Sequence, residues 1–170
     1  TGTFYRTAGK ALPVVGPDGK ELDMGKQAFR FKPGDLRNWP DAETANAVIF
    51  YHWETGILPL KRVDEALHTV TFGGEFKWPF WGNQRYYVEN FRDALDAPGE
   101  WYLDHAAGRL YYRPREGEDM QQATVIAPRL QQLVLFRGDP ELGALVTNVH
   151  FEGLGFQHTN TVLGPQGHCD

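Results

Sequence analysis

The sequence contains no serine and has a single cysteine, Cys169, among its 170 residues. One thiol cannot form an internal disulfide framework or a multi-cysteine zinc site, and a serine nucleophile is excluded. No apolar run approaches the roughly 18 to 20 residues that a membrane-spanning helix needs. Lysine and arginine are scattered and the formal net charge is −5, so nothing resembles a binding surface for nucleic acid or an anionic membrane. We expect neither partner.

Metal and nucleotide motifs are also missing. The chain has no HExxH, no CxxC and no calcium-loop pattern. His168, Cys169 and Asp170 are ligand types, but adjacent residues on an extended chain point alternately and cannot converge on one ion. The glycine pairs near Gly73 and Gly153 lack the strand–glycine–helix context of a phosphate loop. We therefore expect no metal and no cofactor.

Turn residues and aromatic residues are abundant. There are 19 glycines and 11 prolines, and 14% of the residues are aromatic. Turn signals recur between short runs of alternating or apolar residues, which favours an all-β module, sandwich-like or barrel-like, over α/β. The run from Ala47 to Trp53 predicts a central strand, and we expect Trp39 and Trp53 to lie in the core. The clearest hairpin prediction is EWYLDHAAGRLYYR, which turns at Gly108.

The pattern changes after a charged stretch from Pro114 to Met120. Beyond it, apolar strand pairs recur with a period near 23 residues. The triplets at Phe136 and Phe151 share Phe and Gly, at a spacing of 15 that does not fit this register. Such a period is typical of a solenoid, whose rungs stack on one another. Two rungs are not expected to be stable alone, and no capping pattern precedes Asp170, so we expect the chain to be a fragment of a longer protein.

Two stretches carry a resemblance to a known family. RYYVENFRDALDAPGEWYLD at residues 85–104, followed by GRLYYRP at 108–114, resembles the junction of insertion domain and β-helix in proteins similar to glycoside hydrolase family 141. VTNVHFEGLGFQHTN at residues 146–160 is similar to the first complete rungs of that right-handed parallel β-helix. The resemblance implies a β-sandwich-like insertion domain at residues 1–115 and the opening rungs at 116–170. It also implies a secreted or periplasmic protein that acts on plant or host glycans.

Glycoside hydrolysis needs two carboxyl groups about 5 to 9.5 Å apart. Glu100 and Asp104 share one face of a predicted strand, but four rises along it separate them by roughly 13 Å. We interpret Glu100 as a structural residue at the strand start and Asp104 as the beginning of the turn. The family's catalytic carboxylates are expected on later coils, so the chain itself is predicted to hold no catalytic residue.

Candidate saccharide-binding residues occur in two places. Trp78 and Trp81 belong to the cluster FKWPFW, whose flat rings could stack on sugar faces or seal the module against the β-helix. His158 and Asn160 follow Phe156 at a spacing of two, where a rung bends, and could hydrogen-bond sugar hydroxyls or the backbone of the bend. His150 alternates with apolar neighbours and is expected to point outward.

The sequence therefore predicts part of a carbohydrate-active β-helix protein, a glycoside hydrolase acting on a polysaccharide or oligosaccharide. The alternative is a non-catalytic glycan-binding or adhesion protein on the same scaffold, because a solenoid offers a long surface without requiring chemistry. A polysaccharide lyase is a third possibility, but it needs a basic proton abstractor and usually calcium carboxylates, which this stretch does not show.

Overall fold

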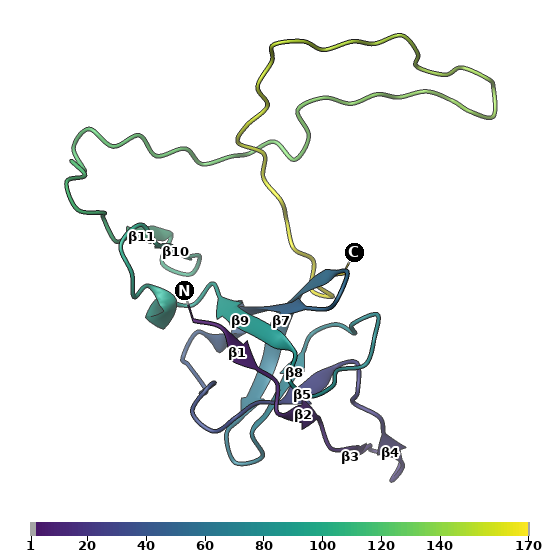
Figure 1. Ribbon diagram of the computed structural model, residues 1–170, viewed down its shortest axis with the longest axis vertical. Helices are drawn as coiled ribbons and strands as arrows, with labels where there is room; N and C mark the ends of the chain where they lie inside the picture. The colour runs from purple at the N-terminus through teal and green to yellow at the C-terminus, as the bar shows by residue number, and fades with distance from the viewer. Residues whose placement is uncertain (1–2, 170) are drawn as a thin grey trace. The chain divides into compact units, whose positions relative to one another are not determined.

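The computed structural model describes residues 3–169 (Figure 1). The chain divides into two compact units, Thr1–Glu118 with Leu163–Asp170, and Asp119–Val162, each considered on its own below. Within residues 3–169 there is no α-helix, and the named strands pair only in antiparallel fashion. The protein is therefore all-β, as the sequence predicted.

The first unit is built around one antiparallel sheet. Its strands follow the order β1-β9-β6-β7-β8-β5-β2, and β12 pairs with β7 beside this path. The strands are β1 (Tyr5–Arg6), β2 (Gly9–Lys10), β5 (Ala28–Arg30), β6 (Asn46–Phe50), β7 (Thr55–Asp64), β8 (Thr69–Phe72), β9 (Arg85–Glu89) and β12 (His168–Cys169).

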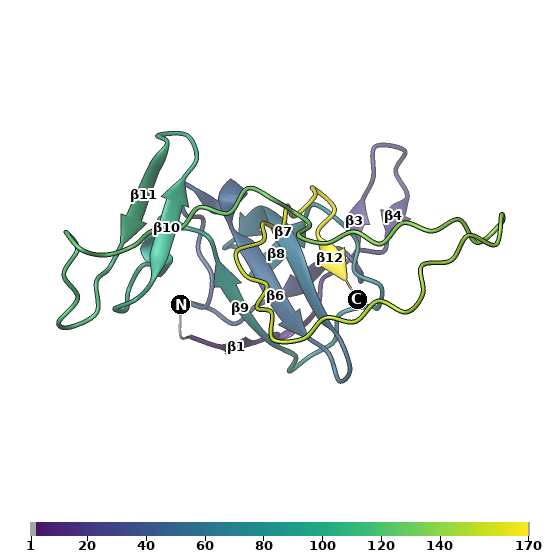
Figure 2. The same cartoon turned by 90° about the horizontal axis from the view of Figure 1, so that it is seen from above.

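The two ends of this strand order are joined by the chain itself. β1 pairs with β9 and β2 pairs with β5, yet only two residues separate β1 from β2. Thr7 donates its backbone N–H to Gln84 on one side at 2.9 Å, and Ala8 donates to Arg30 on the other at 2.6 Å. The stretch from Tyr5 to Lys10 therefore closes the sheet on itself. Figure 1 shows β1 beside β9 and β2 beside β5, and Figure 2 shows β1 beside β9 from above.

The long strand β7 pairs with β6 along its first half and with β8 along its second half. Residues 55–59 pair with β6, and the register shifts between Leu60 and Arg62 where pairing passes to β8. On its first half, Ile57 and Gly56 also pair with His168 and Cys169 of β12. Strand β6 lies between β9 and β7 in the sheet and is largely buried. This confirms the central strand predicted from the apolar run that begins at Ala47.

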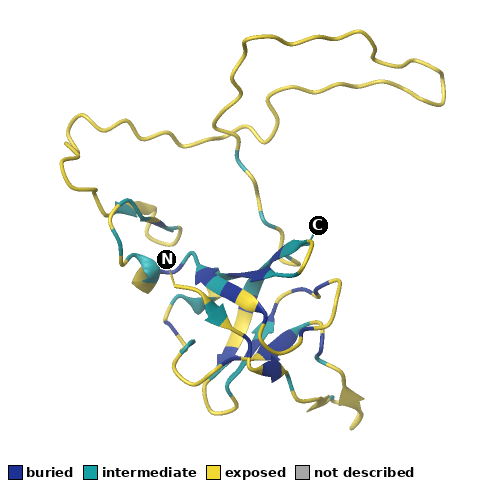
Figure 3. Ribbon diagram, in the orientation of Figure 1, coloured by how far each residue is buried: buried dark blue, intermediate teal, exposed yellow. Residues whose placement is uncertain are grey.

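The core consists mainly of aromatic rings and branched aliphatic side chains. Figure 3 shows the buried residues gathered in this sheet. Phe29 lies at its centre, with its ring centroid 4.8 Å from Tyr86, 5.3 Å from Phe80 and 5.4 Å from Phe72. Phe29 and Phe31 are buried while Arg30 and Lys32 are exposed, as expected for a strand with one apolar face.

Two hairpins and two short 3₁₀ turns complete the first unit. β3 (Val14–Val15) pairs with β4 (Glu21–Leu22), and β10 (Trp101–Asp104) pairs with β11 (Arg109–Tyr112). The β10–β11 hairpin is the one predicted above, and each hairpin turns through a glycine with positive φ, 76° at Gly19 and 62° at Gly108. The 3₁₀ turns are η1 (Ala42–Thr44) and η2 (Arg92–Ala94).

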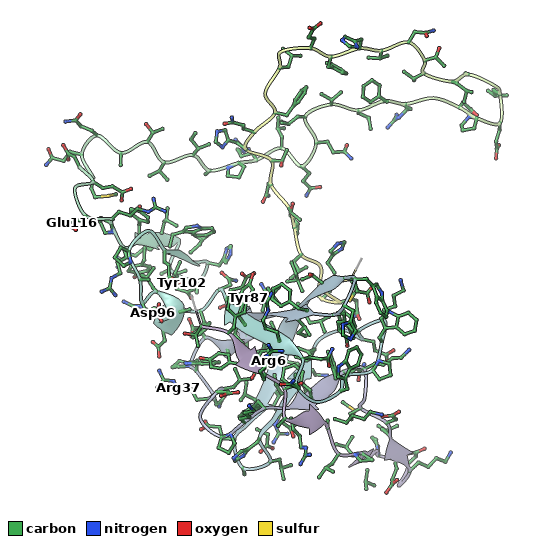
Figure 4. The ribbon with its side chains drawn as sticks, viewed as in Figure 1. Arg6, Arg37, Tyr87, Asp96, Tyr102 and Glu116 are labelled. Carbon is green, nitrogen blue, oxygen red and sulfur yellow. The ribbon has the colours of Figure 1, made fainter. Side chains whose placement is uncertain are left out.

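Side chains of this unit are drawn in Figure 4, which labels Arg6 on β1 and Tyr87 on β9. Arg6 donates from Nη1 to the carbonyl of Asn83, 3.0 Å away. The guanidinium of Arg85 lies 4.7 Å from the ring centroid of Phe4 and 4.5 Å from that of Phe50. These contacts tie the segment before β1 and the end of β6 to β9.

The second unit, Asp119–Val162, contains no named strand; Asp139 and Ala144 form one antiparallel bridge. The described chain therefore shows no parallel β-helix in this unit. Apolar side chains of the repeat, such as Val134 and Phe156, are exposed. The matching triplets do meet, since the rings of Phe136 and Phe151 lie edge to face, 5.9 Å apart.

Neither of the short helical turns described in residues 3–169 has the length and hydropathy required to cross a membrane.

Candidate functional site

An open hollow of about 360 Å³ lies on the first unit, and its lining is mostly aromatic. Three segments distant in sequence contribute to it: strand β2, the tip of the β6–β7 hairpin, and the loop between β8 and β9. The lining residues are Lys10, Trp53, Trp78, Pro79, Phe80 and Trp81. The two predicted tryptophans, Trp78 and Trp81, therefore share one site.

The loop between β8 and β9 is anchored by two buried phenylalanines. Phe76 and Phe80 are buried in the core, and their backbone N–H groups donate to the carbonyls of Lys26 and Gly25, both at 2.7 Å. The tryptophans between and after them remain accessible, with 42% of Trp78 and 37% of Trp81 exposed. The cluster FKWPFW therefore divides into a buried anchor and an exposed pair of rings.

Tyr51 supports this loop from the hairpin side. Its hydroxyl lies 3.1 Å from the carbonyl oxygen of Trp78 and 3.3 Å from that of Pro79, and donates toward them. Its ring stacks on Phe76 with centroids 4.2 Å apart and meets Trp81 edge to face at 4.8 Å. Burial raises the pKa of the Tyr51 hydroxyl to about 12, so this donor keeps its proton at neutral pH.

The expectation that Trp53 lies in the core is wrong, because 71% of this residue is exposed. Strand β6 ends at Phe50, and residues 51–54 form the hairpin turn, in which Tyr51 donates its N–H to the carbonyl of Glu54 at 2.9 Å. Trp53 therefore lies at the hairpin tip, where its ring meets Trp78 nearly at right angles, 6.3 Å away. Trp39, by contrast, is buried as predicted.

Trp81 is held firmly at its backbone. Its N–H donates to Oε1 of the buried Gln84 at 2.7 Å, and its carbonyl accepts from the hydroxyl of the buried Thr7 at 2.6 Å. The imidazole of His52 stacks on its indole ring, with centroids 6.0 Å apart and planes inclined by 19°. A ring fixed in this way binds a flat ligand with little further loss of conformational freedom.

The charged groups near the hollow are mainly cationic. Lys10 is the one charged residue in the described lining. Lys77 places its ammonium 6.0 Å from the ring centroid of Trp78 and 3.8 Å from Oε2 of Glu54. The side chain of Glu54 is only 4% exposed, so this carboxylate is turned away from solvent.

The other two predicted binding residues, His158 and Asn160, belong to the second unit. His158 is exposed and adopts a positive φ of 63°, a conformation in which histidine is enriched among non-glycine residues. The backbone N–H of Asn160 donates to the carbonyl of Leu130 at 2.8 Å. Their role toward a ligand stays a prediction. His150 is exposed, as predicted.

The two strand-end carboxylates have the structural roles expected of them. Glu100 accepts from the N–H groups of Asp96 and Ala97, both at 2.8 Å, and Asp104 accepts from the N–H of Ala107 at 2.8 Å in the hairpin turn. Searched over the described residues, the structure shows no group of three or more potential metal ligands. Asp170, considered above with His168 and Cys169, lies outside the described residues.

The arrangement can hold flat, partly apolar rings against indole faces, with a cation within reach. Sequence reasoning singled out Trp78 and Trp81 but missed Lys10 and Trp53, which come from other parts of the chain. An aromatic residue at a hairpin tip is the signal that could have identified Trp53, because turn residues are exposed.

The fold and the site together define an all-β protein with an exposed aromatic hollow. Comparisons with protein-family models, with curated proteins and with solved structures found no match to this chain.

Proposed function

We propose that this chain is part of a carbohydrate-active β-helix protein and that the aromatic hollow of its first unit binds saccharide rings. In this proposal residues 1–115 form a sandwich-like insertion module, and residues 116–170 form the opening rungs of a right-handed parallel β-helix. The reaction is hydrolysis of glycosidic bonds by a carboxylate pair on later coils, in an extracellular or periplasmic protein. The resemblance at residues 85–160 and the repeat period support it.

The observation that carries the proposal is the exposure of three tryptophans around one hollow. Isolated exposed apolar residues are ordinary, but several indole rings gathered at a concave surface indicate a binding site. The apolar C–H face of a sugar ring can pack against indole, while its hydroxyls remain in water or bond to polar groups at the edge. The buried phenylalanines beneath the loop hold these rings in place.

A non-catalytic glycan-binding or adhesion protein is the second candidate. It is favoured by the state of Glu54, which follows Trp53 in sequence: this carboxylate is buried and lies beside Lys77, so it is poorly placed to protonate a leaving oxygen. The hollow can therefore bind a sugar without any chemistry of its own. Either candidate has a polysaccharide or oligosaccharide as partner, and neither requires a cofactor or metal held by this chain.

Binding to a panel of plant and host oligosaccharides, measured by calorimetry and by tryptophan fluorescence, tests the proposal. We expect one or more sugars to bind, and Trp78→Ala and Trp81→Ala each to weaken that binding about tenfold, or about 1.4 kcal/mol. Trp101→Ala is the matched control, because Trp101 is 64% exposed but lies on β10, outside the hollow. Absence of binding across the panel, or equal weakening by Trp101→Ala, would contradict the proposal.

An assay for glycosidic bond cleavage distinguishes the glycoside hydrolase from the non-catalytic glycan-binding protein. If the chain is part of a hydrolase whose carboxylates lie on later coils, residues 1–170 bind the sugar without releasing new reducing ends, and a longer chain carrying those coils releases them. A non-catalytic protein binds in both forms and releases reducing ends in neither.

A further inference from the structure

We infer that the hollow selects saccharides that carry a carboxylate, with the ammonium group of Lys10 as the partner of that charge. This inference rests on the proposed function and concerns the same site. It names a uronate-containing oligosaccharide as the ligand, in place of a neutral one.

The position of Lys10 is the first argument. Lys10 lies on β2, at the seam where the sheet closes, and its backbone is fixed by pairing with Phe29 and by the Nε–H of Arg30, which donates to its carbonyl at 3.1 Å. Lys10 is one of the residues that line the hollow, together with the tryptophans. Over residues 3–169, no carboxylate lies within ion-pair distance of its ammonium. The charge is therefore available to a ligand.

The balance of charge around the rings is the second argument. Lys10 contributes the one charge in the described lining, and next to the lining the ammonium of Lys77 lies beside the almost fully buried carboxylate of Glu54. Glu75, next to Phe76 in sequence, accepts from the side-chain amide of Gln27 at 3.3 Å and is not part of the lining. The site is locally positive on a chain whose net charge is −5.

The positive charge of Lys10 distinguishes among the ligands that could stack on the indole rings. A quaternary ammonium ligand would suit an aromatic cage, but here it would meet Lys10 and be repelled. A neutral sugar would stack and leave the ammonium to water. A sugar carboxylate gains a charge-assisted hydrogen bond in addition to stacking. Because the protein as a whole is negative, the preference comes from this local contact and not from long-range attraction.

The test compares galacturonic acid trisaccharide with the matching neutral galactose trisaccharide, by calorimetry on the full chain. We expect the uronate to bind about fivefold more tightly, the factor that an exposed ion pair of about 1 kcal/mol provides. Lys10→Met should reduce this preference to less than about twofold, whereas Lys10→Arg keeps it. Lys61→Met is the charge-matched control, because Lys61 is exposed on β7 and outside the lining.

The outcomes separate the inference from the proposed function. Equal affinity for both sugars, or a uronate preference that persists in Lys10→Met, overturns the inference and leaves saccharide binding intact. Failure of both sugars and of every member of the oligosaccharide panel overturns the proposed function. Binding of a proline-rich peptide in the hollow, with no binding of sugars, contradicts both, because such peptides also dock on aromatic grooves. Circular dichroism of the Lys10 variants checks that they fold.

Discussion

The ring of Phe76 lies directly over the backbone of Gly56, so close that a Cβ at Gly56 would fall 1.7 Å from Cε2 of that ring. Gly56 is in β7, at the base of the hairpin that carries Trp53, and Phe76 anchors the loop that carries Trp78. The absence of a side chain at one position thus lets the two halves of the hollow approach each other.

Gly56→Ala should therefore lower the free energy of unfolding by about 3 kcal/mol, because a methyl group forced into a packed core displaces the ring beneath the site. Urea denaturation followed by circular dichroism measures the change. Gly155→Ala is the control, since a Cβ there meets nothing within 4 Å. If Gly56→Ala unfolds at the same urea concentration as Gly155→Ala, the packing described here is incorrect.

The tyrosines of the core predict a loss of stability at high pH. Burial raises the pKa of Tyr51 to about 12 and raises that of Tyr86 as well, whereas tyrosines of the unfolded chain titrate near pH 10. Above about pH 10 the unfolded chain releases protons that the folded protein retains, so the free energy of unfolding falls as pH rises toward 12. Tyr51→Phe should make this decline shallower.

Urea denaturation at a series of pH values from 8 to 12 measures this decline. At pH 8, Tyr51→Phe should cost about 1 kcal/mol through the lost hydroxyl contacts with Trp78 and Pro79. Tyr111→Phe removes a hydroxyl from the small hairpin β10–β11 and serves as the control. A decline that is equally steep in Tyr51→Phe and in the unmodified protein would show that Tyr51 is not shielded as described.

The segment before β12 packs closely against the backbone of Gly74. A Cβ at Gly74 would lie 2.0 Å from the carbonyl oxygen of Gln166. Gly74→Ala should therefore displace residues 165–169 and make the Cys169 thiol about tenfold more reactive toward a disulfide reagent, because β12 opens more often. Gly164→Ala, in the same segment but with open space at its Cβ, should leave the rate unchanged. Equal rates in the two variants would contradict this docking.

Limited trypsin digestion should cut first within the second unit. Arg129 and Arg137 lie in exposed chain without strand pairing, whereas Arg30 and Arg62 lie in paired strands. Cleavage at the first pair should be about tenfold faster or more, because a protease acts on extended, accessible backbone. Peptide masses at early times identify the sites. Early cleavage at Arg30 or Arg62 would mean that the sheet is less stable than its pairing indicates.

Local patterns predicted much of the first unit, and long-range pairing accounts for what they missed. The hairpins at Gly19 and Gly108 were predictable because a turn glycine and its flanking strands lie within a few residues. The closure by Tyr5–Lys10 was not, since it joins residues far apart, such as Thr7 and Gln84. The apolar run from Ala47 to Trp53 also failed to show that β6 ends at Phe50, and this is why Trp53 was expected in the core.

Local sequence patterns likewise identified only some of the residues of the candidate site. Trp78 and Trp81 were identifiable because four aromatic residues fall within one short loop. Lys10 carries no local signal, and it becomes part of the hollow only because the closing segment places β2 beside β5. In the second unit the repeat period stays a prediction, because residues 119–162 contain no named strand and show no stacked rungs.

The closure of the sheet has a consequence for biosynthesis. The closing segment leaves the ribosome before β9, but the hydroxyl of Thr7 accepts from the N–H of Gln84, 77 residues further along the chain. Until β9 has been made, β1 has no partner and the seam stays open. Folding of this unit is therefore expected to wait for its most distant contact, which makes it slow for its size and leaves edge strands unprotected during synthesis.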